Sequence, residues 1–310
     1  MSVLWGVPYL LIKVAVDDLG PAWIAFGRVV IALAILVPLA HRRGALGCLR
    51  GRWAGLTLVG ALEVAAPFLL ISAGEEHISS SLTGLLIASE PLLVAILALR
   101  LDVTERVNRS RLFGLLVGFA GVGALLGLDV GGDRLALLGA GMVLAATACY
   151  ATGVLIVNRR FDDVPRVPLA TGVLVSGAVL LVPAALLDVP ASAPSPGAIA
   201  AVATLGVACT AVGFLGFFAL IAEVGAGRAT VITYVNPAVA VALGVAVLGE
   251  PFGPATVAGF LLIVAGSWLS TGGSPPWPRR RASRDAPPKA GANLVRRVLP
   301  DHLREALRRP

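Results

Sequence analysis

The sequence predicts an all-α integral membrane protein with ten transmembrane helices arranged as two inverted five-helix repeats. Three features lead to this fold class: the composition, the number of long apolar runs, and a similarity between the two halves of the chain. Of the 310 residues, 57% are apolar and only 14% are charged, whereas about a quarter of a soluble domain is charged. Uninterrupted apolar runs such as 174–187 exclude a soluble enzyme, and they exclude an outer-membrane barrel, whose strands alternate in polarity.

The apolar runs set the number of transmembrane helices. One helix needs about 20 mostly apolar residues to cross the hydrocarbon core, and charged or Pro- and Gly-rich breaks divide the chain into ten such runs. Their limits are 2–16, 21–40, 53–73, 78–99, 111–128, 135–157, 167–187, 198–221, 229–248 and 254–271. The first run would cover only about 22 Å of a core about 30 Å thick, so we expect a truncated first helix or a start codon placed a few residues late.

The positive charges in the loops predict how the helices are oriented. With the N-terminus in the cytoplasm, the cytoplasmic loops hold twelve Arg residues and the external loops hold Arg134 alone. Loops rich in Lys and Arg stay in the cytoplasm. Because the number of spans is also even, both termini are expected to be cytoplasmic.

Segment 272–310 differs from the rest of the chain in charge and composition. Up to residue 271 the chain carries 15 Lys and Arg against 15 Asp and Glu, whereas this segment carries 10 against 3. Its Pro- and Arg-rich composition cannot form a packed core. We interpret it as a basic cytoplasmic tail that is either solvated or lies on the anionic inner leaflet, and nucleic acid is not an expected partner.

A weak internal repeat appears when the chain is shifted by about 145 residues. The prolines match at an offset of 146, and the glutamates and glycines that follow them match at 145. The matched pairs are Pro91 with Pro237, Glu105 with Glu250, Gly114 with Gly259, and Gly121 with Gly266. At the same offset Trp5 faces Tyr150 and Lys13 faces Asn158.

The repeat predicts the domain organisation. Residues 1–128 form the first five-helix repeat, 129–271 the second, and 272–310 the tail. An odd number of crossings per repeat means that the second copy enters the membrane from the opposite side, so the halves are inverted. Inverted repeats that meet around a site at the membrane midplane are a transporter architecture.

The ordered set of these features resembles the EamA-type branch of the drug/metabolite transporter superfamily. It comprises Arg28 in the second span, Trp5 and Gly6 in the first, prolines in spans four and nine, and the Glu-Gly-Gly pattern after each proline. The resemblance covers residues 1–271. It implies a proton-driven or exchanging carrier of small metabolites, often amino acids, with a central cavity between the halves. The chain departs from the pattern at Glu90, and at Pro251, which follows Glu250 where Arg106 follows Glu105.

Four ionisable side chains, Lys13, Arg28, Glu63 and Glu90, fall at membrane depth, where each costs about 2.5 to 3.5 kcal/mol on insertion scales. Glu63 lies 13 residues before the turn residue Glu76 and Glu90 lies 14 after it, so an antiparallel hairpin puts both carboxylates at one depth. Such a pair could exchange a proton, as in a proton-coupled carrier, or contact the substrate. Alternatively the carboxyl groups are permanently protonated and hydrogen-bonded, or paired with a cation.

The two cations have structural interpretations as well. Lys13 lies near the external end of the first span, and snorkelling of its ammonium to the surface is the first interpretation. Arg28 lies deeper. Structural pairing is its first interpretation, and binding an anionic group such as a carboxylate is the second.

Prolines and aromatic residues complete the candidate site. Glu90 precedes Pro91 as Asn236 precedes Pro237, and a proline within a helix frees a carbonyl and kinks the axis. Kinks at corresponding positions of two halves point to a central binding site, which makes Asn236 a candidate contact. Packing or interface anchoring is the first interpretation of the aromatic residues and a cavity wall is the second. They are Trp5, Tyr9, Tyr150 and Tyr234.

Glycines and helix-end glutamates have packing roles in this interpretation. Gly114, Gly118 and Gly121 form a smooth stripe for close helix packing, with a homodimer face as the alternative. Glu105 and Glu250 lie at helix ends and are interpreted as cap or interface residues.

These observations predict function. Cysteines and histidines lack the spacing of a metal site, and there is no HExxH, GxSxG or P-loop pattern, so neither an enzyme nor a cofactor is expected. The prediction is a secondary transporter that moves a small metabolite, amino acid-like or a related compound or drug, across the inner membrane by alternating access. Export, with proton coupling or exchange, is the expected mode, and the lipid bilayer is the expected environment. The alternative is a membrane channel or a non-transporting scaffold.

Overall fold

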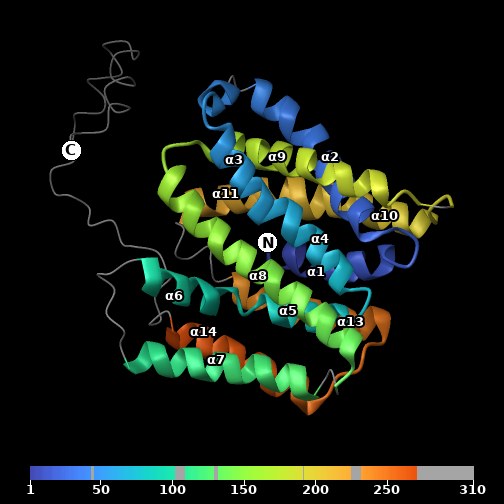
Figure 1. Ribbon diagram of the computed structural model, residues 1–310, viewed down its shortest axis with the longest axis vertical. Coiled ribbons are helices and arrows are strands. Elements are labelled where there is room, and N and C mark those ends of the chain that lie inside the picture. Colours follow the sequence, from blue (N-terminus) through green and yellow to red (C-terminus); the bar gives the residue numbers. More distant parts are fainter. Residues whose placement is uncertain (43–44, 102–108, 129–131, 191, 225–231, 271–310) are drawn as a thin grey trace, which may run out of the picture. The chain divides into compact units, whose positions relative to one another are not determined.

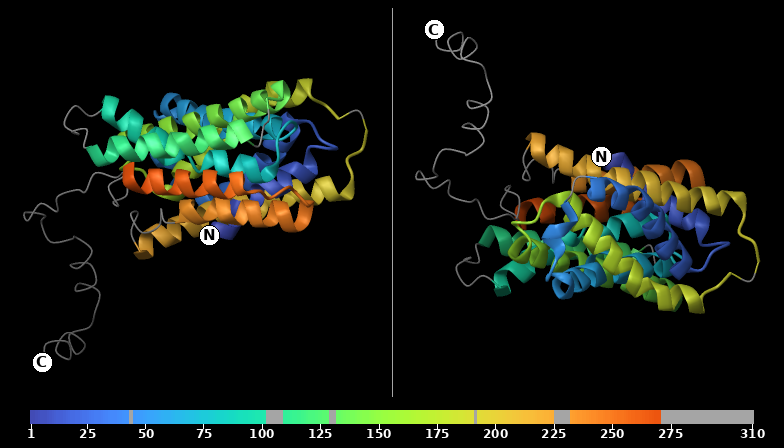
Figure 2. Two further views of the ribbon diagram at one scale, coloured as in Figure 1. Left: turned by 90° about the horizontal axis from the view of Figure 1, so that it is seen from below. Right: turned by 90° about the horizontal axis from the view of Figure 1, so that it is seen from above.

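The computed structural model describes residues 1–42, 45–101, 109–128, 132–190, 192–224 and 232–270, and these form helices joined by turns and short connections. Within these ranges no strand occurs, as the sequence predicts. The chain divides into a unit of residues 1–276 and a unit of residues 277–310. All the helices below belong to the first unit, whereas the predicted tail lies outside the described residues. Figures 1 and 2 show these helices running back and forth beside one another.

The helices follow the predicted apolar runs closely. Up to residue 128 they are α1 (Ser2–Ala15), α2 (Pro21–Arg42), the 3₁₀ turn η1 (Ala45–Leu49), α3 (Trp53–Gly60), the π-helical η2 (Ala61–Ala65), α4 (Ala66–Gly74), α5 (Ser80–Ile87), α6 (Glu90–Leu101) and α7 (Arg109–Leu128). Beyond it they are α8 (Arg134–Arg160), α9 (Arg166–Leu187), α10 (Pro196–Thr204), the π-helical η3 (Leu205–Val212), α11 (Gly213–Val224), α13 (Ile232–Leu248) and α14 (Pro254–Ser270).

Length and hydropathy identify the helices that can cross a membrane. Seven described helices qualify: Pro21–Arg42, Trp53–Gly74, Ser80–Leu97, Arg109–Gly127, Arg134–Arg160, Arg166–Leu187 and Pro196–Phe217. Three shorter apolar helices accompany them: Ser2–Ala15, Tyr234–Leu248 and Thr256–Ser270. Large apolar side chains such as Leu187, Val179 and Leu116 point outward, at 90%, 65% and 63% exposure. Apolar surface of this extent suits a lipid environment and not water.

Two of the long spans depart from regular α-helical hydrogen bonding in their middle. The span Trp53–Gly74 contains η2, and the span Pro196–Phe217 contains η3. A π-helical stretch accommodates an extra residue in a turn, and such stretches are frequent at functional sites. Both stretches contribute side chains to the cavity described below.

The two prolines that were predicted to kink helices have different surroundings. Turn residues Ala88 and Ser89 interrupt the fourth span, so Pro91 is the second residue of α6, a position that needs no backbone N–H donor. Pro237 lies inside the continuous helix α13. The residue before each proline, Glu90 and Asn236, lines the same cavity.

The predicted glycine stripe packs α7 against α14, which lie side by side along one edge of the bundle (Figure 1). A Cβ atom added to Gly114 would lie 2.8 Å from the carbonyl oxygen of Gly266, and one added to Gly121 would lie 2.9 Å from that of Gly259. Real Cβ atoms do not approach backbone this closely, so the glycines are required for the observed contact. The close-packing interpretation is therefore confirmed, whereas nothing here tests the homodimer.

A pair of alanine substitutions tests this packing. We expect Gly121→Ala to lower the free energy of unfolding by about 1–3 kcal/mol, because a methyl group would overlap backbone atoms of α14 that cannot move aside. Gly123 is the matched control on the same helix, because a Cβ there would meet no atom within 4 Å. Gly123→Ala should leave stability unchanged or raise it by up to about 1 kcal/mol. Thermal unfolding of the purified protein in detergent measures both, and equal melting temperatures would contradict the packing assignment.

Glu250 caps a helix of the other half of the chain. Its carboxylate accepts hydrogen bonds from the backbone N–H groups of Ser80 and Ser81, at 2.7 and 2.9 Å, and from the Ser81 hydroxyl. Ser79 Oγ accepts from the next free N–H, that of Leu82, at 3.1 Å. Unpaired N–H groups and the helix dipole favour a carboxylate at this end of α5. The cap interpretation is confirmed for Glu250, and Glu105 lies outside the described residues.

A second carboxylate joins the halves at the start of α2, and an ion pair joins the loops that precede α3 and α9. Asp188 accepts a hydrogen bond from the N–H of Ala22 at 3.0 Å.

In the ion pair, Asp163 accepts two hydrogen bonds from Arg52, at 2.8 and 2.6 Å. The hydrogen bonds from Arg52 hold the pKa of the Asp163 carboxyl below its usual value. The pair is exposed, so its contribution to stability is small and would be lost as the carboxyl protonates at low pH.

Candidate functional site

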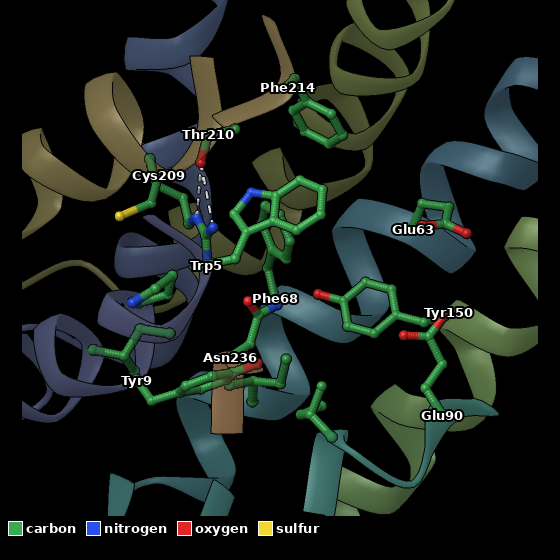
Figure 3. Close-up of a pocket in the computed structure, with 15 residues that line it drawn as sticks. Trp5, Tyr9, Glu63, Phe68, Glu90, Tyr150, Cys209, Thr210, Phe214 and Asn236 are labelled. Atoms are coloured by element: carbon green, nitrogen blue, oxygen red, sulfur yellow. Dashed lines mark hydrogen bonds between the residues drawn. The ribbon is translucent and has the colours of Figure 1, made fainter. Parts of the chain in front are cut away.

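A cavity of about 200 Å³ lies between helices from both halves of the chain. It is lined by seven of the nine side chains proposed from the sequence as substrate or proton sites: Trp5, Tyr9, Arg28, Glu63, Glu90, Tyr150 and Asn236. The other lining residues are Pro8, Ile12, Phe68, Ile71, Ile87, Cys209, Thr210 and Phe214. Figure 3 shows these side chains converging from helices that are far apart in the sequence.

Lys13 and Tyr234, also proposed from the sequence, lie outside this lining. The ammonium of Lys13 donates hydrogen bonds to the backbone carbonyls of Glu75 and Ile78, at 2.5 and 3.0 Å. Lys13 therefore ties the end of α1 to the turn between α4 and α5. Its neighbour Glu75 is fully buried although it lies in the polar turn sequence, and it interacts electrostatically with Lys13 and Glu250.

Arg28 forms the cationic wall of the cavity. The side chain is 7% exposed, and its Nε and Nη2 donate to the hydroxyl of Thr210 at 3.3 and 3.2 Å. The Phe68 ring covers one face of the guanidinium, with its centroid 3.8 Å from Cζ, a cation–π contact. Gly206 lets η3 approach α2 closely enough for this arrangement, since a Cβ there would lie 2.9 Å from the Arg28 carbonyl oxygen.

Glu63 and Glu90 form an acidic wall. Both line the cavity together with Tyr150. Figure 3 shows the two carboxylates and Tyr150 on one side of the cavity, with Thr210 and Cys209 on the other. The sequence predicted that the two carboxylates lie at one depth in an antiparallel hairpin, and in the structure both line the same cavity.

The local backbone explains where Glu63 points. It lies in the π-helical stretch η2 and packs against Gly153 of α8, where a Cβ would lie 2.7 Å from Glu63 Cγ. Glu63 Oε1 is buried and has no hydrogen-bond partner within the described part of the chain. An unpartnered buried carboxylate oxygen is costly, so this carboxyl group is a natural acceptor for a proton.

The remaining walls are aromatic and amide. Trp5 packs on the rings of Phe214 and Phe217, with centroid distances of 6.4 and 4.7 Å. The Asn236 amide, oriented so that its nitrogen faces acceptors, donates to the carbonyls of Ile232 at 2.8 Å and Ser2 at 3.2 Å. Asn236 thereby connects α13 to the start of α1.

Sequence reasoning missed several lining residues. Thr210 was overlooked because a threonine in an apolar run satisfies its hydroxyl on its own helix and gives no polarity signal. Cys209 was interpreted as a packing residue, and Phe68 and Phe214 look like ordinary membrane side chains. The one signal in the sequence was that Cys209 and Thr210 are adjacent polar residues within the apolar run of span eight.

The arrangement can hold a small molecule that carries opposite charges at its two ends. A carboxylate suits the guanidinium, an ammonium suits the acidic wall, and the aromatic and aliphatic side chains between them suit an apolar group. Neither wall has the metal-ligand or nucleophile arrangement of a catalytic centre, and among the described residues no three His, Cys, Asp or Glu side chains form a metal-binding group.

Comparison with known proteins gives a consistent picture. The chain is 28% identical to a probable terminal-alkyne amino-acid exporter of Streptantibioticus cattleyicolor, over 86% of this chain and 89% of that protein. It is 26% identical to an uncharacterized transporter of Archaeoglobus fulgidus, over 86% and 94%, and 26% identical to the uncharacterized inner membrane transporter YedA of Escherichia coli, over 81% of both.

A solved crystal structure shares the fold. It superposes with a TM-score of 0.61 and 21% identity over 87% of this chain and 96% of that one. The model of the EamA-like transporter family matches residues 1–127 and again residues 137–272. The resemblance inferred from the sequence is therefore confirmed, and the molecule is a membrane transporter. The chain belongs to the EamA-like transporter family.

Proposed function

We propose that the protein is a secondary carrier that moves a small amino acid-like metabolite across the inner membrane by alternating access. The observation that carries this proposal is the cavity, in which a buried guanidinium lies across from two carboxylates with apolar walls between them. A zwitterion with an apolar side chain matches this distribution of charge. The name of the Streptantibioticus cattleyicolor relative, an amino-acid exporter, supports the same substrate class and the outward direction.

Alternating access requires two halves that rock about the site, and several contacts support an inverted repeat. Gly114 contacts Gly266, and Gly121 contacts Gly259. In the repeat Gly114 corresponds to Gly259 and Gly121 to Gly266, so the two contacts are related by the repeat. The π-helical stretches η2 and η3 also lie about 145 residues apart. The family model matches twice, once in each half. Seven long and three shorter apolar helices support ten spans, an even number that would put both termini on one side of the membrane. The Arg-rich loops favour the cytoplasm as that side.

Proton coupling is the second part of the proposal. Glu63 and Glu90 line the cavity where the substrate would bind, so a proton and the ammonium of a substrate would compete for the same carboxylates. A carrier of this kind releases the substrate when it takes up a proton, and releases the proton when it takes up the substrate. This exchange couples export of the substrate to entry of protons.

The experiment is a counterflow assay in proteoliposomes. Vesicles loaded with one of the twenty proteinogenic amino acids are diluted into a trace of the same labelled compound, and the transient accumulation of label is recorded. A carrier gives saturable counterflow because one binding site faces the two sides in turn. A channel gives flux without counterflow, and a scaffold gives no flux, so either result would overturn the proposal.

A further inference from the structure

We propose that Thr210 is a positioning residue that orients Arg28 so that one edge of its guanidinium can bind the carboxylate of the substrate. This inference rests on the proposed function, since it assigns the part of the cavity that recognises one end of an amino acid-like molecule. It adds an uncharged residue that was not among the site residues predicted from the sequence.

The first step is the geometry of Thr210 itself. Its Oγ1 donates to the carbonyl oxygen of Leu205 at 2.8 Å, five residues back in the π-helical stretch η3. In a regular α-helix a threonine bonds to the carbonyl three or four residues back, as Thr204 does with Ala200 at 2.8 Å. The π-helical register therefore fixes the direction of the hydroxyl proton and leaves the oxygen's lone pairs for another donor.

The second step is what those lone pairs accept. Arg28 donates to this one oxygen from both Nε and Nη2, at 3.3 and 3.2 Å. A guanidinium can hold a carboxylate with two parallel hydrogen bonds either along its Nε/Nη2 edge or along its Nη1/Nη2 edge. Thr210 takes the first edge, so the second edge remains for a ligand.

The third step is the plane of the guanidinium. Phe68 covers one face at 3.8 Å from Cζ. With one edge held by Thr210 and one face covered by Phe68, the group cannot rotate freely. A preorganised donor pair binds more tightly than a mobile one because less conformational entropy is lost on binding. Both Arg28 and Thr210 line the cavity in which the substrate would bind.

The test compares three substitutions at two threonines. Thr210→Val keeps the shape of the side chain and removes the hydroxyl, whereas Thr210→Ser keeps the hydroxyl. Thr204→Val is the matched control, because Thr204 makes the same kind of bond to its own helix, is exposed and does not line the cavity. The probes are the twenty proteinogenic L-amino acids and, for each, the carboxamide in which the carboxylate is replaced by a neutral amide.

Counterflow in proteoliposomes gives the KM of each transported acid and the inhibition constant of its carboxamide. We expect Thr210→Val to raise the KM of the acid at least tenfold, with a much smaller change for the carboxamide, so that the preference for the acid collapses. Thr210→Ser and Thr204→Val should keep that preference. A merely structural role of Thr210 would weaken the acid and the carboxamide equally.

The outcomes separate this inference from the proposed function. If the parent protein moves an amino acid and Thr210→Val retains both its KM and its acid preference within twofold, Thr210 does not position Arg28 and the proposed function stands. If the parent moves none of the twenty, the proposed substrate class is wrong and this inference falls with it. Melting temperatures of all variants within a few degrees of the parent exclude unfolding as the cause. If Thr210→Val does not fold, the decisive comparison is Thr210→Ser against Arg28→Lys. Acid recognition that is impaired in Arg28→Lys alone supports a guanidinium edge held by the hydroxyl, and equal recognition by both variants overturns the inference.

Discussion

Replacing Glu90 by Gln is expected to reduce accumulation driven by a pH gradient at least tenfold while counterflow of the same substrate persists. Gln has nearly the shape of a protonated Glu and does not bind or release a proton at physiological pH. Glu90 lines the cavity and interacts electrostatically with Glu63. Its loss therefore removes the step in which proton and substrate exchange, but it leaves a cavity that binds substrate from either side.

The measurement is uptake of a labelled substrate into proteoliposomes with and without an imposed pH gradient. Glu76→Gln is the matched control, because Glu76 is exposed in the turn between α4 and α5 and does not line the cavity. Accumulation that is unchanged in Glu90→Gln would keep the carrier function and remove Glu90 as a proton site. The same assay on Glu63→Gln then shows whether the proton is held by the other carboxylate of the wall.

The second large effect is expected at Arg28. Arg28→Met should weaken binding of a carboxylate-bearing substrate at least a hundredfold, since two hydrogen bonds to a charged group contribute about 1.5–3 kcal/mol each. Met keeps most of the side-chain volume and removes a buried charge that forms no ion pair within the described residues, so the cost of burying that charge is relieved. The protein should therefore remain as stable as the parent although it no longer binds its substrate.

Binding of the labelled substrate to purified protein, measured beside thermal unfolding, separates these effects. A melting temperature far below that of the parent would mean that Arg28 has a structural role, and structural pairing was its first interpretation from the sequence. Unchanged affinity in a stable Arg28→Met protein would contradict the role of Arg28 in binding.

The sequence predicted the helices well because membrane helices are specified by length and hydropathy. Spans such as α2 and α9 need only a long apolar run between polar loops, and both features are visible in a single sequence. The hairpin that brings Glu63 and Glu90 to one cavity could also be predicted, because the distance along two antiparallel helices follows from the rise per residue.

Departures from regular helices could not be predicted from the sequence. A π-helical stretch such as η2 or η3 changes hydrogen bonds by one residue and leaves hydropathy unaltered. The break at Ala88 and Ser89 lies just before Glu90 and Pro91, and a proline is compatible both with a kink inside one helix and with the start of a new one. Pro91 was expected inside a kinked helix and instead lies at the start of α6. Thr210 was missed for the same reason, since its role depends on the π-helical register around it.

The burial of Glu75 shows a different kind of limit. A Gly-Glu-Glu-His turn between two spans looks like an exposed loop, and Glu76 is indeed exposed, but Glu75 is at 0% exposure. Glu75 is close to residues far away in sequence, and its backbone carbonyl accepts a hydrogen bond from the ammonium of Lys13. Contacts between residues so far apart in the chain leave no mark in hydropathy or in a weak internal repeat.

The most direct test of the central claim is the affinity of the purified protein for an amino acid that it exchanges, compared with two relatives of that compound that each lack one charged end. One is the carboxamide, which cannot pair with Arg28, and the other is the deaminated acid, which cannot pair with Glu63 and Glu90. A cavity with a cationic wall and an acidic wall should bind the amino acid at least tenfold more tightly than either relative. Equal affinity for all three compounds would contradict a site that recognises both ends of a zwitterion.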